Sequence, residues 1–349
     1  MKTRITEMLK IEYPILMSGM SWISVPEMVA AVSNAGGLGI LATGPLNAEG
    51  TRQAIKKIRS LTDRPFGANA TLLFPGGSEN AKVLLEEKVP VINFSLGRGD
   101  WICKAAHEYG GKVLATVTRG RHALSAQKQG ADAVISTGYE AAAHGEEVAN
   151  LLLIPSLADS LDIPVIGAGG FADGRGLAAA LSLGAEGISM GTRFMATKES
   201  PLHENYKRLA LEKDVNDTLF SKRLDGIWCR ALDTPGARKQ IKAGLNFKQL
   251  LKALPNSRLI AKQLGMPYLK MFFGVLLSGW ETSSQLAYMA NAFDSIIKAT
   301  TDGDSEEGWL TVGQSTGLVH DLPSVAEVIE RIVKEAGEIA ESVKQKVKS

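Results

Sequence analysis

Two glycine-containing loops are the first candidates for chemistry, because each follows a short apolar run. The first loop is Gly167-Ala168-Gly169-Gly170-Phe171-Ala172-Asp173-Gly174, and the second is Met190-Gly191-Thr192-Arg193-Phe194. Adjacent glycines let backbone N–H groups approach an anion closely, and the start of a following helix adds partial positive charge. Gly191 and Thr192 can add a backbone donor and a hydroxyl, with Arg193 near enough to contribute charge. Together the loops predict a cradle for a phosphate monoester; the open alternative is that the glycines only make tight turns.

One histidine stands in a loop of small residues, Gly138-Tyr139-Glu140-Ala141-Ala142-Ala143-His144-Gly145. The small side chains of Ala142 and Ala143 permit close packing against a planar ring, and an imidazole beside such a ring can act as a general base or a hydrogen-bond donor. His144 is therefore the candidate catalytic residue. The alternative is a structural or exposed histidine, which is how the other four histidines are interpreted.

Two further segments offer contacts to a planar ligand. The loop Met17-Ser18-Gly19-Met20-Ser21-Trp22 carries small and soft side chains that can lie flat against a ring, although a simple loop with a core Met and Trp fits equally. Asn69 interrupts the apolar segment 65–73, and a buried amide must find hydrogen-bond partners. The edge of a heterocycle would satisfy Asn69, and so would a neighbouring loop.

Eight short apolar runs position these loops. They are Pro14–Met17, Leu38–Ala42, Pro65–Leu73, Val91–Ser95, Val113–Val117, Ala133–Thr137, Pro164–Ala168 and Gly187–Met190. The runs are rich in Val, Ile and Leu without polar alternation, which is typical of strands buried on both faces of a parallel sheet. Helical stretches that end at glycine separate many of them. The pattern predicts an α/β fold, a (β/α)8 TIM barrel with its active site at the carboxyl ends of the strands.

The pattern changes beyond the eighth run. Residues 213–304 read as irregular helices without strand runs, and we expect a helical insertion that covers the barrel mouth. An amphipathic helix from about Ser324 to Lys346 then returns to the barrel. The expected organisation is therefore a barrel over residues 1–212, a helical cap over 213–304, and a return to the barrel over 305–349.

Composition limits the classes of partner. The chain has 349 residues, with 39 basic and 37 acidic residues scattered along it, so no one-sided basic field is expected and neither nucleic acid nor a membrane is an expected partner. Its two cysteines, Cys103 and Cys229, lie far apart, which predicts neither a disulfide framework nor a metal site. The first residues contain no apolar signal segment, and a cytoplasmic location is expected.

The motifs in combination resemble the nitronate monooxygenase family, formerly called 2-nitropropane dioxygenases, over roughly residues 1–205 and 305–335. The segments that carry the resemblance are 17–20, 34–39, 65–69, 138–145, 169–176 and 191–194, together with the pair Gly313-Gln314. The same superfamily contains NAD(P)H:quinone reductases and FMN-dependent enoyl-thioester reductases. The resemblance therefore supports an expectation about the fold and the cofactor of this chain more strongly than one about its reaction.

The resemblance implies FMN as the cofactor, with His144 facing the flavin. The implied cofactor-binding residues are Ser18, Gly19, Met20, Asn69, Thr116, Thr137, Ala142, Ala143, Ala168, Gly169, Gly170, Gly191 and Thr192. Several positions depart from the family pattern: Met17-Ser18 replaces a Gln-Gly pair, and Ala143 replaces a glycine. These extra side-chain atoms are expected to narrow the pocket. Thr116 and Thr137 stand where the quinone reductases carry a lysine and an acidic residue, which argues against a direct transfer of the reductase activity.

The activity that the resemblance implies is oxidation of nitronates or nitroalkanes by O2 to a carbonyl compound and nitrite. The enzymatic alternative is NAD(P)H-dependent reduction of a quinone or an enoyl thioester through FMN. A catalytically silent barrel that binds a phosphorylated ligand is the alternative from another class. The expected partners are small molecules, and the sequence leaves open a homodimer and the identity of the substrate.

Overall fold

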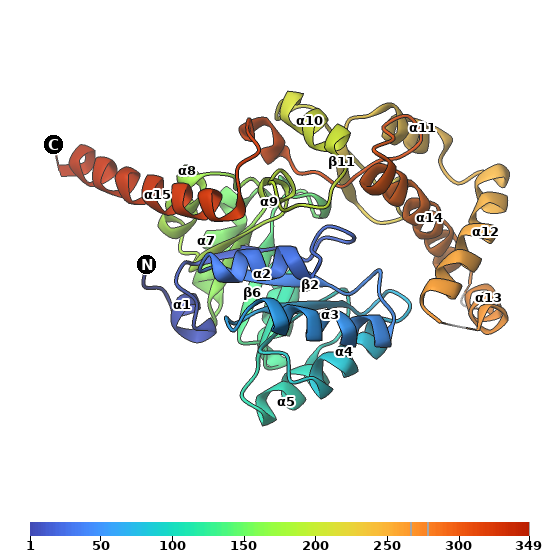
Figure 1. Ribbon diagram of the computed structural model, residues 1–349, viewed down its shortest axis with the longest axis horizontal. Coiled ribbons are helices and arrows are strands. Elements are labelled where there is room, and N and C mark those ends of the chain that lie inside the picture. The colour runs from blue at the N-terminus through green and yellow to red at the C-terminus, as the bar shows by residue number, and fades with distance from the viewer. Residues whose placement is uncertain (266, 278, 349) are drawn as a thin grey trace.

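The computed structural model describes residues 1–265, 267–277 and 279–348, and eight parallel strands form a closed barrel at its centre (Figure 1). The barrel strands are β1 (Ile15–Met17), β2 (Leu38–Ala42), β3 (Gly67–Thr71), β4 (Val91–Ser95), β5 (Lys112–Val117), β6 (Ala133–Thr137), β8 (Val165–Ala168) and β9 (Gly187–Met190). The first and last strands close the barrel, since β1 pairs in parallel with both β2 and β9. The predicted (β/α)8 barrel is confirmed, and each predicted apolar run overlaps one of these strands, although β5 begins one residue before its run, at Lys112.

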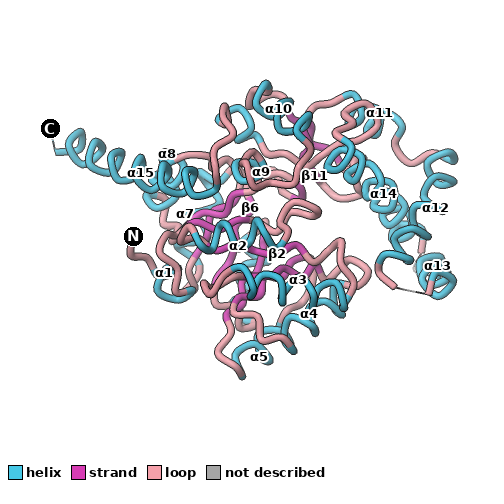
Figure 2. The backbone as a smooth tube through the Cα atoms, in the orientation of Figure 1, coloured by secondary structure: helices cyan, strands magenta, loops and turns pink. Residues whose placement is uncertain are grey.

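Helices surround the barrel, as the cyan and magenta tubes of Figure 2 show. They are α2 (Pro26–Asn34), α3 (Ala48–Leu61), α4 (Gly77–Glu86), α5 (Asp100–Glu108), α6 (Gly120–Lys128), α7 (Asn150–Ser160), α8 (Gly174–Ser182) and α15 (Val325–Lys348). Gly36, Gly130 and Gly184 follow α2, α6 and α8 with positive φ angles of 90°, 94° and 96°. Glycine adopts this left-handed conformation without a steric penalty, so the helix-glycine-strand pattern of the sequence ends each helix and turns the chain into the next strand.

The barrel is closed at one end and open at the other. Helix α1 (Arg4–Leu9) places Ile5 and Leu9 against side chains of the barrel interior, such as Leu38 and Ile166, and so seals the amino-terminal end of the strands. A second apolar layer, which includes Val29 and Ile92, fills the space between the strands and the outer helices. The carboxyl ends of the strands are therefore the end available for a site.

The segment between β9 and α15 contains both helices and strands. Its elements are α9 (Thr192–Met195), α10 (Glu204–Glu212), β10 (Thr218–Ser221), β11 (Cys229–Leu232), α11 (Pro235–Ala243), α12 (Phe247–Gln263), α13 (Tyr268–Leu277), α14 (Trp280–Ile297), a π-helix (Lys298–Asp302) and a 3-10 helix (Gln314–Leu318). The expectation of a cap without strands is wrong, because β10 and β11 form an antiparallel sheet with β7 (Ala143–His144). These strands are four residues long or shorter and contain Arg230, so no apolar run marks them.

The insertion and the C-terminal helix lie on opposite flanks of the barrel (Figure 1). Helix α15 packs on α8 and α2, and buries residues such as Val325 and Ile332. A Cβ at Gly174 would lie 2.5 Å from the backbone nitrogen of Ala336, so glycine is needed for the close approach of α8 and α15. The last helix thus completes the barrel wall, while α12, α13 and α14 extend from its mouth.

Candidate functional site

A cavity of about 1210 Å³ lies at the carboxyl ends of the strands, between the barrel loops and helices α12 and α14. Twelve predicted cofactor-binding residues and the predicted catalytic residue line it: Ser18, Gly19, Met20, Asn69, Thr116, Thr137, Ala142, His144, Ala168, Gly169, Gly170, Gly191 and Thr192. The side chain of Ala143 lies outside the described part of the chain, although its backbone belongs to β7. Residues predicted from separate loops therefore meet in one space.

The ends of β8 and β9 present a set of backbone donors to this cavity. Gly169 and Gly170 adopt φ angles of 100° and 82°. The N–H groups of Gly170, Gly191 and Thr192 donate no hydrogen bond to another described residue. A Cβ at Gly191 would meet only the flexible Met20 side chain, with the sulfur at 3.3 Å. Free donors beside open space fit the phosphate monoester that the two loops predict.

Two expected sources of positive charge are directed elsewhere. Arg193 is buried, and its guanidinium donates to Asp321 Oδ1 at 2.9 Å and to the Ala196 carbonyl at 2.7 Å. At the start of α8, Asp173 accepts from the Gly176 N–H and Glu335 accepts from the Gly174 N–H. The prediction that Arg193 and this helix end contribute charge to the cradle is therefore wrong. The candidate anion site depends on backbone donors and the Thr192 hydroxyl, which accepts from the Gly313 N–H at 3.0 Å.

The loop that precedes His144 packs directly on the first glycine loop. A Cβ at Gly169 would lie 2.7 Å from the backbone nitrogen of Ala141. The amide of Asn150 donates to the carbonyl oxygens of Ala168 and Gly169, at 2.9 and 2.7 Å, and is buried between the two loops. Because these contacts join the loops, a shift of the phosphate cradle would also move the segment that leads to His144.

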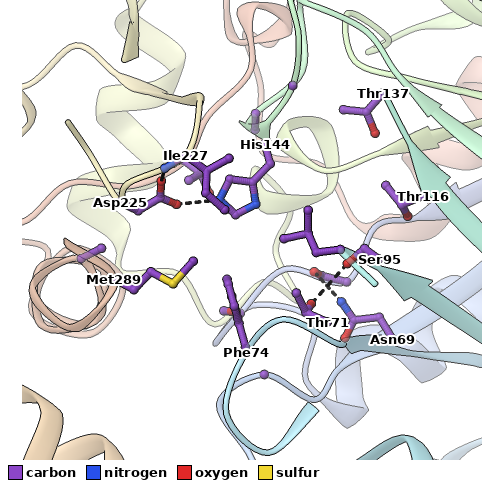
Figure 3. Close-up of a pocket in the computed structure, with 18 of the residues that line it drawn as sticks. Asn69, Thr71, Phe74, Ser95, Thr116, Thr137, His144, Asp225, Ile227 and Met289 are labelled. Atoms are coloured by element: carbon purple, nitrogen blue, oxygen red, sulfur yellow. Dashed lines mark hydrogen bonds and ion pairs between the residues drawn. The ribbon is translucent and has the colours of Figure 1, made fainter. Parts of the chain in front are cut away.

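Polar side chains form a row across the ends of β3 to β6 (Figure 3). Asn69 pairs with Asn93 in the strand register, and its Oδ1 accepts from the Thr43 N–H at 3.0 Å. Asn93 Nδ2 donates to Thr116 Oγ1 at 3.0 Å. These bonds hold the amides in fixed orientations toward the cavity. Sequence reasoning identified Asn69 and missed Asn93, although both interrupt an apolar run in the same way.

His144 is bonded to an acidic residue of the insertion. Its Nε2 lies 2.6 Å from Asp225 Oδ2, and the other oxygen of Asp225 accepts from the Ile227 N–H at 3.1 Å. Figure 3 shows the imidazole between Asp225 on one side and the strand-end residues on the other. Burial lowers the pKa of His144, but the charge of Asp225 and the hydrogen bond to it raise it, and the net pKa lies above the ordinary value. Sequence reasoning missed Asp225.

The small sheet explains this contact. His144 of β7 is paired with Cys229 of β11, so the insertion is fixed to the loop that carries the histidine. The buried thiol of Cys229, Asp225 and His144 have ligand-type atoms within 4.8 Å of one another. The 2.6 Å separation of His144 and Asp225 is that of a charge-assisted hydrogen bond, which accounts for the pair without a metal.

The opposite side of the cavity is apolar and comes from the insertion. Phe247, Leu251 and Leu254 of α12 line it, together with Met289 and Phe293 of α14. Phe247 and Leu254 remain 74% and 41% exposed, so the cavity surface is open at this end. Within the insertion these residues form a wall suited to apolar groups, facing the polar row across the cavity.

The departure at Met17 does not narrow the cavity as expected. Met17 is fully buried in the apolar layer outside the barrel, and its neighbour Ser18 is the residue that lines the cavity. Ser18 Oγ lies 2.8 Å from Ser189 Oγ, on the adjacent strand.

Across the described residues, we find no helix long and apolar enough to cross a bilayer.

Comparison with known proteins places the chain among oxidoreductases. A family model described as nitronate monooxygenase matches residues 2–83 and 76–335. A Rhodococcus jostii protein named (3aS,4S,5R,7aS)-5-hydroxy-7a-methyl-1-oxo-octahydro-1H-indene-4-carboxyl-CoA dehydrogenase is 35% identical, over 96% of both chains. A probable nitronate monooxygenase of Staphylococcus aureus is 30% identical, over 66% of this chain and 78% of the relative. The solved structure of FabK from Thermotoga maritima matches with a TM-score of 0.84 and 37% identity, over 99% of each chain.

Proposed function

The chain belongs to the nitronate monooxygenase family and is an oxidoreductase, and we propose that it uses FMN to act on acyl thioesters. The observation that carries this proposal is the cavity, which combines a candidate phosphate cradle and a polar row on the barrel with an open apolar wall on the insertion. The enoyl-thioester alternative of the sequence analysis is therefore favoured here over nitronate oxidation.

The barrel side fits FMN. The free N–H groups of Gly170, Gly191 and Thr192 would hold the terminal phosphate, and the fixed amide of Asn69 would face the ring. When bound, FMN supplies the redox chemistry of the reaction, while the protein orients the substrate and tunes the site. We infer from the cradle at the ends of β8 and β9 that the cofactor is a mononucleotide.

The apolar wall of the cavity supports a large substrate. Pockets for a single small molecule usually measure about 300–1,000 Å³, and the cavity of about 1210 Å³ exceeds this range, so it has room for FMN and a substrate together. A nitronate such as that of nitropropane is small, and would leave the wall of α12 and α14 uncovered. An extended acyl group would bury Phe247, Leu251 and Leu254, and burial of apolar surface is favourable. The whole-length likeness to a protein named as a CoA-thioester dehydrogenase supports the same substrate class.

His144 would supply a proton or a hydrogen bond beside the redox centre. Reduction of a 2-enoyl thioester adds a hydride to one carbon of the double bond and a proton to the other. The raised pKa of His144 keeps more of its imidazole protonated near neutral pH, and Asp225 occupies Nε2. Nδ1 is then the ring nitrogen left to face the substrate and to donate.

Parallel assays of the purified protein test the proposal. We expect anaerobic oxidation of NADH or NADPH that depends on added 2-enoyl-CoA, with the saturated thioester identified by mass spectrometry. Turnover of nitronates with oxygen consumption, but of none of the thioesters, would overturn the thioester assignment.

Nitronate oxidation is the second candidate, and the family model favours it. In that reaction the donor on His144 would bind the nitro oxygens of the anionic substrate. The same pair of assays separates the two candidates, because nitrite is released only from a nitronate or nitroalkane.

A further inference from the structure

Helix α13 presents two apolar faces among the side chains that the structure describes. Phe272 and Val275 face the cavity, so the helix contributes to the site with one face. On another face, Leu269, Phe273 and Leu277 recur every four residues and are 67%, 57% and 87% exposed. Large apolar side chains that stay exposed together mark a contact with a partner or with a membrane. The described structure therefore leaves a continuous apolar stripe of α13 uncovered.

The same part of the chain is strongly basic. Between Thr234 and Trp280 there are no acidic residues and eight basic ones: Arg238, Lys239, Lys242, Lys248, Lys252, Arg258, Lys262 and Lys270. The rest of the chain contains the other 31 of the 39 basic residues and all 37 acidic residues, so it is net acidic. The near-neutral net charge of the whole chain hides this asymmetry, and the sequence-based expectation of scattered charge is wrong for this segment.

Several of these charges are available to an external partner. Arg238, Lys239 and Lys252 form ion pairs with Asp233, Glu307 and Asp294. Lys248, Arg258 and Lys262 of α12 are exposed and have no ion pair with a described residue. Leu259, which is 50% exposed, lies on the same helix, so that the outer surface of α12 carries both basic and apolar side chains.

We propose that residues 247–265 and 267–277, here called the cap tip, bind the surface of an anionic phospholipid membrane. A basic face with Phe, Leu and Trp side chains is typical of helices that lie in the membrane interface. The cap tip lies at the outer edge of the molecule (Figure 1), so α13 can reach a bilayer. A second copy of the chain fits less well, because a two-fold interface would place two acid-free basic surfaces against each other.

Membrane contact would also orient the cavity. Helices α12 and α13 also line the cavity, through Phe247, Leu254 and Phe272. Their outer faces on lipid would bring the open apolar wall of the site next to the bilayer. Negatively charged lipids attract each basic residue near the surface, which corresponds to about fivefold in partitioning per charge.

Vesicle flotation of the purified protein tests this proposal without any measurement of turnover, so its failure leaves the proposed activity untouched. The two vesicle types contain phosphatidylcholine alone, or phosphatidylcholine with phosphatidylglycerol. The charge variant combines Lys248→Gln, Arg258→Gln and Lys262→Gln. Its matched control combines Lys56→Gln, Lys82→Gln and Lys104→Gln, which are exposed lysines of the barrel helices with no ion pair to a described residue.

We expect the parent protein and the control to float with phosphatidylglycerol vesicles only, and to be released by salt. The charge variant should partition roughly 100-fold less, from about fivefold for each of three charges. The second variant, Phe273→Ser with Leu277→Ser, should also lose binding while its charge is unchanged.

Three results would overturn the proposal. The first is that the parent protein does not float with phosphatidylglycerol vesicles. The second is sedimentation of the parent as a dimer that the Phe273→Ser and Leu277→Ser variant abolishes, which assigns the stripe to a second copy. The third is that the parent binds soluble polyglutamate as well as it binds vesicles, and that the serine variant binds both normally. That result would indicate that the basic residues bind an acidic protein.

Discussion

The barrel and the insertion build the two sides of the cavity in different ways. The barrel presents backbone donors and amides that are fixed by buried hydrogen bonds, such as those of Asn150 and Asn93. The insertion presents one carboxylate, Asp225, and a wall of apolar side chains that is still partly exposed. We propose that the difference is a division of labour, in which the barrel would hold FMN while the insertion adjusts His144 and shapes the substrate site.

The largest expected effect lies on the barrel side. His144→Ala should keep the bound flavin and the fold but lose roughly 100- to 10,000-fold in kcat, the usual contribution of general acid–base groups. Steady-state kinetics with flavin content measured in parallel checks this. His107→Ala is the matched control, since His107 is exposed and bonded to Asp132 away from the cavity. A His144→Ala enzyme as active as the parent would leave the histidine structural.

A change at Gly191 should affect the cofactor rather than the fold. Gly191→Asp places a carboxylate at the candidate phosphate cradle, and juxtaposed like charges cost several kcal/mol, so FMN affinity should fall roughly 100-fold. Gly191→Ala should bind FMN better than Gly191→Asp, since only Met20 must move. Gly337→Asp, where nothing lies within 4 Å of a Cβ, controls for charge. Full flavin occupancy in Gly191→Asp would place the phosphate elsewhere.

Removal of the insertion's charge should change the pH dependence. Asp225 helps to raise the pKa of His144, so the stabilisation of the protonated form is complete below the ordinary pKa and is lost as pH rises through the raised one. In Asp225→Asn, kcat should therefore fall at a lower pH than in the parent, with a loss of roughly 10- to 100-fold, the scale of one charge-assisted hydrogen bond.

A pH profile of kcat distinguishes positioning from a structural role of Asp225. Asp225→Glu keeps the charge and should recover part of the profile. Asp214→Asn, an exposed carboxylate of the same segment, should leave it unchanged. An identical profile in Asp225→Asn and the parent would separate Asp225 from the titration of His144.

The two regions should also differ in their response to truncation. Ile92→Ala removes a fully buried barrel side chain and should lower the free energy of unfolding by about 2–5 kcal/mol. Phe247→Ala removes a side chain that is 74% exposed and should change it by less than about 0.5 kcal/mol. Chemical denaturation of both variants measures the difference. A large loss in Phe247→Ala would show that the cap wall is part of the folding core.

Local sequence predicts the barrel well and the insertion poorly, for physical reasons. Strands buried on both faces need apolar runs, and many helices end at a glycine. Both features involve residues that are close together in the sequence, so the sequence alone can predict them. Asp225 is 81 residues from His144, and nothing near it in the sequence signals the contact. The prediction that the Arg193 side chain lies near the phosphate cradle was wrong, because its ion-pair partner, Asp321, is 128 residues away in the sequence. Asn93 could have been predicted from the sequence, since it interrupts an apolar run in the same way as Asn69.

The division of labour is tested most directly by the ratio of kcat/KM for a long and a short 2-enoyl-CoA, measured in the parent and in Phe247→Ser with Leu254→Ser. Both side chains line the cavity from α12 and are partly exposed, so the variant should fold and keep its flavin. The account predicts that the parent prefers the long substrate and that the variant loses this preference through a higher KM, with kcat for the short substrate unchanged. An unchanged preference, or loss of flavin from the variant, would contradict it.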